Sequence, residues 1–274
     1  MTLAQADNIS HTGVTLAPLR SGTVAVAWQT FTDAGDNSIS LRIVDRSGGL
    51  VGQKITIPSP KGGSVRYPTL VALGDGFVLV YARSGPKPAI LAQRYSDRAK
   101  PQGDPLRLDL ANALVHERPQ AAALASGGYA VVWQENTYSL VGGLQVLSDV
   151  TLKGRFLDAD GEPGKRFAIE DNVVEKSLEQ AVSVVDTDEG LLTTWSLRRT
   201  VGSTSNVDIR GVLTPASARP GNVMPLARSV NTNETGPSQA LLTDGRVMLG
   251  YTAASSAPTE DPTGALGVFL TITP

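Results

Sequence analysis

Acidic residues that follow a repeated aromatic position are the residues of this chain best suited to acid–base chemistry. Glu135 lies two residues after Trp133, and Asp33 and Asp36 lie in the corresponding polar segment after Trp28. Two carboxylates brought together from different segments can supply the acid and the base or nucleophile that cleave a glycosidic bond. Acidic residues in loops are also often simply solvated, so both interpretations stay open at this point.

Six polar residues in or beside the expected loops are candidates for ligand binding. Arginine offers a planar fork of donors, a carboxylate accepts from sugar hydroxyls, and tyrosine combines a ring face with a polar tip. Glutamine follows the aromatic position in two repeats, where it could face a ligand or cap an exposed strand end. The candidates are Arg83, Arg118, Glu135, Tyr138, Gln29 and Gln134.

A short acidic segment has the oxygen spacing of a calcium loop. Asp158, Asp160 and Glu162 place carboxylates two residues apart, and Gly161 allows the chain to turn between them. The distal bidentate glutamate of the full motif is missing, and an Asp-Gly turn forms without a metal. Calcium is therefore the one cofactor that the sequence suggests. His11 and His116 lack a third ligand for zinc, and we expect both to be solvated.

The composition limits the partners. The 274 residues carry a net charge of −2, and 18% of them are charged, so there is no basic surplus to attract nucleic acid. No stretch approaches the roughly 18 uninterrupted apolar residues of a membrane span, and no signal sequence is recognisable at Met1. The chain has no cysteine, so packing alone must stabilise it. We expect a monomer that does not insert into membranes.

A repeat organises the whole chain and must position these residues. Five short apolar strands end in an aromatic residue, at positions 28, 81, 133, 195 and 251, and these positions are separated by 53, 52, 62 and 56 residues. Each is preceded by another apolar segment and a glycine-containing turn typical of a hairpin. A third and a fourth strand follow. Each unit is therefore predicted to be a four-stranded antiparallel meander.

The repeat predicts an all-β, five-bladed β-propeller that forms a single domain over residues 1–274. Both parities of the aromatic strands are apolar, as in residues 76–81 and 128–133, so each sheet must be covered on both faces. Radial stacking of blades satisfies this requirement, whereas a long two-sheet sandwich is the less regular alternative. The expected blades comprise residues 14–67, 68–118, 119–179, 180–236, and 237–274 together with 1–13.

The chain ends suggest how the ring closes. The fifth unit stops after a third strand, residues 266–273, and the N-terminal segment 2–6 has the character of a fourth strand. Pairing of the two would complete the last blade without leaving an exposed edge. We therefore expect the ring to be closed by the N-terminal strand.

The repeat resembles the propeller-type repeats of large bacterial secreted and surface proteins. Residues 127–134 (Gly-Gly-Tyr-Ala-Val-Val-Trp-Gln), 154–161 (Gly-Arg-Phe to Asp-Ala-Asp-Gly) and 167–169 carry the resemblance. The resemblance implies an extracellular or cell-surface location and a binding or scaffolding role. It supplies no catalytic residue, because its motifs specify strands and turns.

Two functions from different classes are expected at the rim that carries the longer loops, including residues 134–149 and the inter-blade segments 61–67 and 116–118. The leading hypothesis is a non-enzymatic recognition or scaffold module that binds a glycan or a protein there. The alternative is a glycan-active hydrolase or lyase that uses carboxylates of this rim. Converging carboxylates would favour the enzyme, and dispersed polar groups would favour the module.

Overall fold

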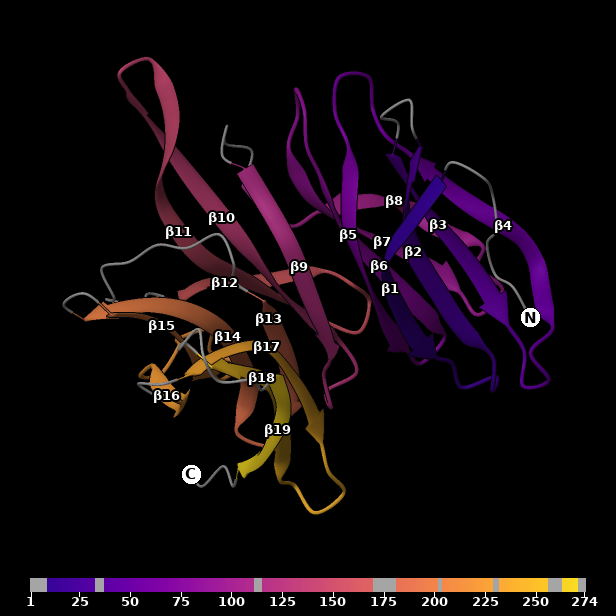
Figure 1. Cartoon of the computed structure of the whole chain (residues 1–274). Coiled ribbons are helices and arrows are strands. Elements are labelled where there is room, and N and C mark those ends of the chain that lie inside the picture. Colours follow the sequence, from indigo (N-terminus) through magenta and orange to yellow (C-terminus); the bar gives the residue numbers. More distant parts are fainter. Residues whose placement is uncertain are drawn as a thin grey trace. The chain divides into compact units, whose positions relative to one another are not determined.

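The structure is a computed structural model that describes residues 9–32, 37–110, 115–169, 181–201, 204–228, 232–255 and 263–270. All regular structure in these ranges is β-strand, and none of them contains a helix. Accordingly, no helix in these ranges is long and apolar enough to cross a membrane. The strands form antiparallel sheets of neighbouring strands, as the repeat predicts (Figure 1).

The described strands form five sheets. The first contains β1 (Ile9–Pro18), β2 (Val24–Thr32), β3 (Asn37–Val44) and β4 (Leu50–Pro58). The second contains β5 (Val65–Leu73), β6 (Gly76–Arg83), β7 (Ala89–Ser96) and β8 (Pro101–Arg107). The third contains β9 (Val115–Ala123), β10 (Tyr129–Val141), β11 (Leu144–Leu157) and β12 (Pro163–Ile169).

The remaining two sheets follow the same order. The fourth contains β13 (Val182–Thr187), β14 (Gly190–Val201), β15 (Thr204–Thr214) and β16 (Met224–Ala227). The fifth contains three described strands, β17 (Thr232–Leu241), β18 (Val247–Ser255) and β19 (Thr263–Leu270). The expected partner of this last sheet, the N-terminal segment 2–6, lies outside the described residues.

The chain divides into two compact units, one of residues 1–135 and 158–163 and the other of residues 136–157 and 164–274. In the first unit, a single buried cluster joins the first two sheets and includes Ile39 and Leu41 from one sheet and Phe77 and Leu79 from the other. In the second unit, Ile209 and Ala227 of the fourth sheet pack with Leu249 of the fifth. Four-stranded blades covered by neighbouring sheets are the propeller type of arrangement.

The aromatic position of the repeat belongs to the core. The side chains of four of the five residues are at most 5% exposed, and only Tyr251 is half-buried; the four are Trp28, Tyr81, Trp133 and Trp195. Their strands are buried on both faces, because every residue from Gly76 to Ala82 in β6 is buried. The apolar residues on both faces of these strands therefore correctly predicted that the sheets are covered on both sides.

Several expected loops are strands. Residues 134–149 form the ends of β10 and β11, joined by Gly142 and Gly143, whose φ angles of 59° and 83° fit a tight hairpin turn. In the first, second, third and fifth sheets the first strand also begins earlier than the sequence indicated. Residues 65–67 belong to β5 and residues 116–118 to β9. Polar composition suggested loops there, but backbone pairing continues through these residues.

A β-bulge that contains a residue with positive φ explains why the sequence pattern predicted too late a start for these first strands. The pairing register shifts between Thr12 and Thr15 in β1 and between Arg66 and Thr69 in β5. Gly13 and Tyr67, at these bulges, have φ angles of 61° and 56°. The extra residue breaks the alternation of side chains, so the sequence pattern beyond it no longer reads as a strand.

Candidate functional site

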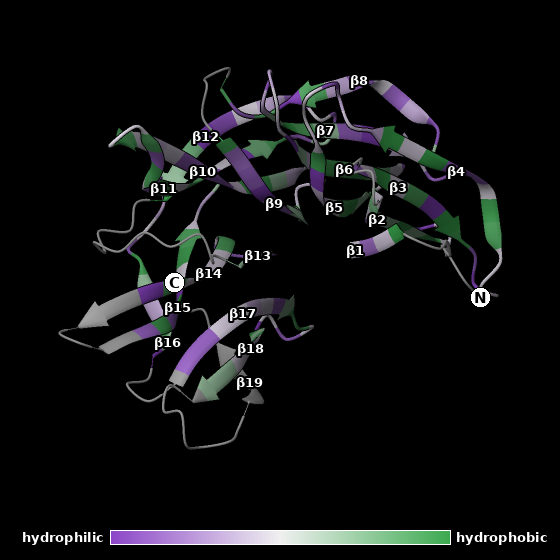
Figure 2. Cartoon of the chain, turned by 45° about the horizontal axis from the view of Figure 1, so that its top comes forward, coloured by the Kyte–Doolittle hydropathy of each residue, from purple (hydrophilic) through white to green (hydrophobic). Residues whose placement is uncertain are grey.

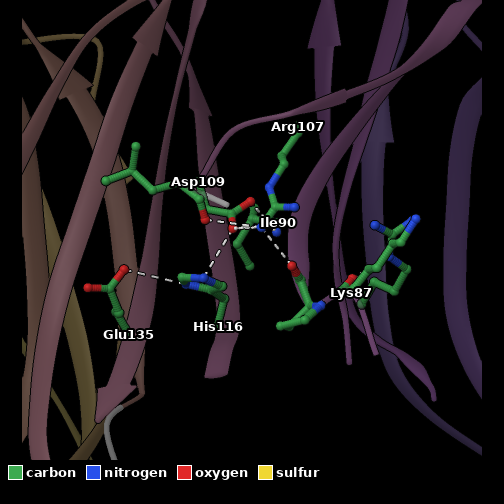
Figure 3. A network of polar contacts seen from close by, with 9 residues as sticks. Lys87, Ile90, Arg107, Asp109, His116 and Glu135 are labelled. Carbon is green, nitrogen blue, oxygen red and sulfur yellow. Dashed lines mark hydrogen bonds and ion pairs between the residues drawn. The ribbon is translucent and has the colours of Figure 1, made fainter. Parts of the chain in front are cut away.

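His116 lies at the centre of a buried polar network in the first unit (Figure 3). Its Nε2 atom is 3.1 Å from Oδ2 of Asp109, and its Nδ1 atom is 3.5 Å from Oε2 of Glu135. The imidazole side chain is 0% exposed. A histidine thus links two carboxylates that are 26 residues apart in the chain.

Asp109 is the fixed end of the network. Its Oδ2 atom also accepts a hydrogen bond from Arg107 Nη2 at 2.7 Å, and its Oδ1 atom accepts one from the backbone N of Ile90 at 2.9 Å. Burial of the carboxyl raises its pKa, but the hydrogen bonds from His116, Arg107 and Ile90 together outweigh burial and hold the pKa below its usual value. Asp109 is therefore an ionised acceptor.

Glu135 is the end of the network that reaches solvent. Its side chain is 15% exposed, whereas those of His116 and Asp109 are fully buried. Because ionised Asp109 can only accept, the Nε2 atom of His116 must carry its hydrogen. Nδ1 then faces the Glu135 carboxyl at 3.5 Å.

Three neighbouring segments position these groups. Asp109 follows β8, where Leu108 N still donates to Ile90 O and continues the pairing with β7. Arg107 Nη2 also donates to the backbone oxygens of Pro88 and Leu110, which braces the turn of chain that carries Asp109. His116 comes from β9 and Glu135 from β10, the second strand of the third sheet.

The burial of His116 contradicts the expectation that both histidines are solvated. His11 is exposed and contacts Thr30 Oγ1 at 3.3 Å through Nδ1, but His116 is enclosed. Asp109 was not among the predicted site residues, because the repeat pattern predicts only an ordinary fourth strand at its position. Alignment of the repeats offered one signal: Glu135 follows Trp133 by two residues, as Thr30 follows Trp28, so His116 and Glu135 could be compared with His11 and Thr30 of the first blade.

Two more of the six sequence candidates meet around Tyr67. The guanidinium carbon of Arg118 lies 5.3 Å from the centroid of the Tyr67 ring. The backbone N of Tyr67 donates to Gln29 Oε1 at 3.4 Å. Gln29 is therefore not on an open channel mouth, since its side chain is buried. Figure 2 shows that β9, the strand to which His116 and Arg118 belong, is hydrophilic over part of its length.

The three remaining candidates have different surroundings. Arg83, at the end of β6, donates from Nε to the backbone oxygen of Lys87 at 3.0 Å. Gln134 is fully buried in β10. Tyr138 is exposed in β10, in a strand where a loop was expected, and belongs to the second unit. Asp33 and Asp36 lie outside the described residues, so their relation to Glu135 stays a prediction.

The proposed calcium segment forms a turn whose first carboxylate is used internally. Oδ1 of Asp158 accepts hydrogen bonds from the backbone N of Asp160 at 3.0 Å and of Glu162 at 2.9 Å. Among the residues that the structure describes, no group of three or more histidine, cysteine or acidic side chains is arranged to hold a metal. The turn explains the motif locally, and bound calcium stays a prediction.

Similarity to known proteins is found at the level of fold. No family model matches the chain, and no curated protein matches it in sequence. A protein of unknown function from Dyadobacter fermentans DSM 18053 superposes with a TM-score of 0.62 at 14% identity, covering 97% of this chain and 80% of that one. The endo-arabinase of Bacteroides thetaiotaomicron VPI-5482 has a TM-score of 0.56 at 11% identity, covering 95% and 94%.

A third similar structure is the family-93 α-L-arabinofuranosidase of Fusarium graminearum in complex with arabinobiose. Its TM-score is 0.58 at 13% identity, and the match covers 95% of this chain and 76% of that enzyme. Glycoside hydrolases thus prevail among the similar folds. This finding corrects the leading hypothesis of a non-enzymatic recognition or scaffold module, which rested on repeat motifs that specify strands and turns.

Proposed function

We propose that this protein is a glycoside hydrolase in which Glu135 exchanges a proton with the substrate. The observation that carries the proposal is the network Asp109–His116–Glu135, in which the only carboxylate that reaches solvent is backed by a buried imidazole. The prevalence of glycan-cleaving enzymes among the similar folds supports the choice of substrate class. The substrate is accordingly a glycan, and the predicted extracellular location suits such an enzyme.

The network suits a group that must act in turn as acid and base. When Glu135 gives its proton to the leaving oxygen of the glycosidic bond, the resulting carboxylate lies 3.5 Å from Nδ1 of His116 and can then take a proton from the attacking water. Asp109 holds the ring through Nε2 and does not touch the substrate, because it is fully buried. In this scheme Glu135 is the catalytic residue, and His116 and Asp109 are positioning residues.

Glycoside hydrolysis requires a second carboxylate on the other side of the bond. Asp109 cannot serve, because it is enclosed behind His116. Asp33 and Asp36, which follow the equivalent aromatic position of the first repeat, are the candidates that the sequence offers. We propose that one of them completes the catalytic pair.

We also propose that five blades close into one ring through the N-terminal segment. The fifth sheet has three described strands, whereas each of the other sheets has four. Deletion of residues 1–7 is expected to lower the melting temperature sharply, since it would expose the edge of the last blade. An unchanged melting temperature in a thermal unfolding scan would rule out this closure.

The enzyme proposal is tested by reducing-sugar release from arabinan, xylan and other plant polysaccharides. Replacing Glu135 with Gln is expected to lower the rate by roughly 100-fold or more, the usual contribution of a general acid or base. Asp33→Asn and Asp36→Asn are measured in the same assay. The variant whose rate falls as far as that of Glu135→Gln identifies the second carboxylate. Circular dichroism of each variant verifies that it is folded.

A matched control separates catalysis from a general loss of charge. Asp75→Asn removes an exposed carboxylate of the same unit, 64% exposed and paired with Arg94 at 3.5 Å, and should leave the rate unchanged. Full activity in the Glu135→Gln variant would show that Glu135 is not the proton donor. A wild-type chain that cleaves none of the polysaccharides would refute the enzyme.

A further inference from the structure

Tyr67 and Arg118 occupy the same position in successive blades, and both have left-handed backbone conformations. Their φ angles are 56° and 51°, and each is followed by proline, at Pro68 and Pro119. A bulky residue with positive φ is strained, and strain of this kind tends to collect at functional sites. The other left-handed non-glycine residues in the described ranges are two alanines, Ala99 and Ala218.

Two sibling blades use glycine at this position. Gly13 and Gly236 have φ angles of 61° and 63°, close to those of Tyr67 and Arg118. A Cβ atom at Gly13 would come no closer than 3.9 Å to its surroundings, and one at Gly236 would meet nothing within 4 Å. Space therefore does not dictate glycine there; the backbone conformation does. The fold works with glycine, so the side chains of Tyr67 and Arg118 require another explanation.

The side chains of Tyr67 and Arg118 contact each other, and N–H groups of Arg118 and of Gln29 have no hydrogen-bond partner. Arg118 lies over the Tyr67 ring, and no carboxylate of the described residues pairs with its guanidinium, whose Nε atom is buried without a hydrogen-bond partner. Gln29, 4% exposed, accepts from the Tyr67 backbone through Oε1, while its Nε2 atom has no partner among the described residues. A half-buried cation without a counter-charge is costly, and so is a buried amide N–H without an acceptor, unless a ligand supplies what is missing.

We propose that Gln29, Tyr67 and Arg118 form a subsite for the carboxylate of an acidic sugar residue, a uronic acid within a glycan. A guanidinium whose face lies on a tyrosine ring presents its N–H groups at the edge, in the plane that matches a carboxylate. The Gln29 amide adds a neutral donor. Arg118 also lies two residues after His116, which contacts Glu135, so β9 would connect the subsite with the proton-exchanging carboxylate.

The inference rests on the proposed glycan-cleaving function for its choice of ligand, and calorimetry tests it without turnover. The full chain with Glu135→Gln is titrated with a galacturonate trisaccharide and with the galactose trisaccharide of the same linkage. We expect the acidic sugar to bind at least tenfold more tightly. Added Arg118→Gly or Arg118→Lys should abolish this preference, because neither retains the planar fork. Arg66→Ala, which removes the exposed arginine beside Tyr67, should preserve it.

Stability distinguishes a ligand site from a packing contact. Tyr67→Gly and Arg118→Gly adopt the residue that sibling blades use, so their melting temperatures should stay level or rise while the preference for the acidic sugar is lost. Equal binding of both sugars, no binding of either, or a preference that survives Arg118→Gly and Arg118→Lys would overturn the subsite. Arg118-dependent binding of the acidic sugar by a chain that hydrolyses no glycan would instead refute the enzyme and leave the subsite standing.

Discussion

His11 in the first blade and His116 in the third occupy the same place in the repeat, yet their surroundings differ. His11 is exposed, contacts the hydroxyl of Thr30, and meets the Trp28 ring edge-on at 6.4 Å. His116 is enclosed between Asp109 and Glu135. One blade position therefore carries a solvated imidazole in one copy and a buried charged network in another.

The difference comes from the partners that the strands bring to each ring. The second strand contributes Thr30 in the first blade and Glu135 in the third. Nε2 of His116 is then covered by Asp109, which arrives from the end of the preceding sheet with its own support from Arg107. A repeat thus places equivalent side chains reliably, while the neighbouring segment decides whether they are buried and what they can do.

Replacement of the aromatic residue is expected to have the largest effect on stability, and an equal one in both blades. Trp28 and Trp133 are 3% and 2% exposed, so Trp28→Ala and Trp133→Ala should each lower the free energy of unfolding by about 3 to 5 kcal/mol. Denaturant unfolding measures both. A loss below about 1 kcal/mol at Trp133 would mean that this residue is not part of the core.

Removal of Asp109 should destabilise the protein much more than removal of Thr30, the residue that contacts His11 in the first blade. Asp109→Ala leaves His116 and Arg107 without their shared acceptor inside the fold, and we expect a loss of about 3 kcal/mol, as for a broken buried ion pair. Thr30→Ala, which removes the exposed contact of His11 in the first blade, should change stability by no more than about 0.5 kcal/mol. Similar losses in the two variants, measured by urea unfolding, would remove the distinction between the sites.

Replacement of the histidines themselves should give a smaller contrast. His116→Gln keeps an amide that can reach only part of the network, and a loss of about 1 to 3 kcal/mol is expected for the buried acceptor left unsatisfied. His11→Gln exchanges one exposed polar group for another and should be neutral. Thermal unfolding of the pair at neutral pH measures the contrast, and a neutral His116→Gln would indicate that water replaces the imidazole.

The smallest expected difference between the two blades lies in how the stability depends on pH. The pKa of Asp109 is lower in the folded than in the unfolded state, so its contribution is present above the unfolded value and is lost as the pH falls through the folded value. Below about pH 4, Asp109→Asn should therefore lose stability less steeply than the wild type. His11→Gln should follow the wild-type curve. Parallel curves for all three proteins would show that Asp109 does not titrate with folding.

The strand order and the two buried faces of a blade could be predicted from the sequence alone. The spacing of the aromatic positions and the glycine turns predicted four-stranded antiparallel sheets, and the double apolar parity of β6 predicted that they are covered on both faces, because these signals depend on neighbours in the chain. The long hairpin of β10 and β11 was missed although its tip carries exposed apolar residues such as Leu140 and Leu144, because a strand end without a buried face lacks the alternation that marks a strand.

The candidate site, by contrast, depends on tertiary contacts. Asp109, His116 and Glu135 come from three strands or strand ends, and nothing in their local sequence distinguishes a buried histidine from a solvated one. The same holds for Tyr67 and Arg118, which both have left-handed backbone conformations and whose contact joins two blades. Burial and charge pairing depend on residues distant in the chain, and only folding brings them within a few ångströms.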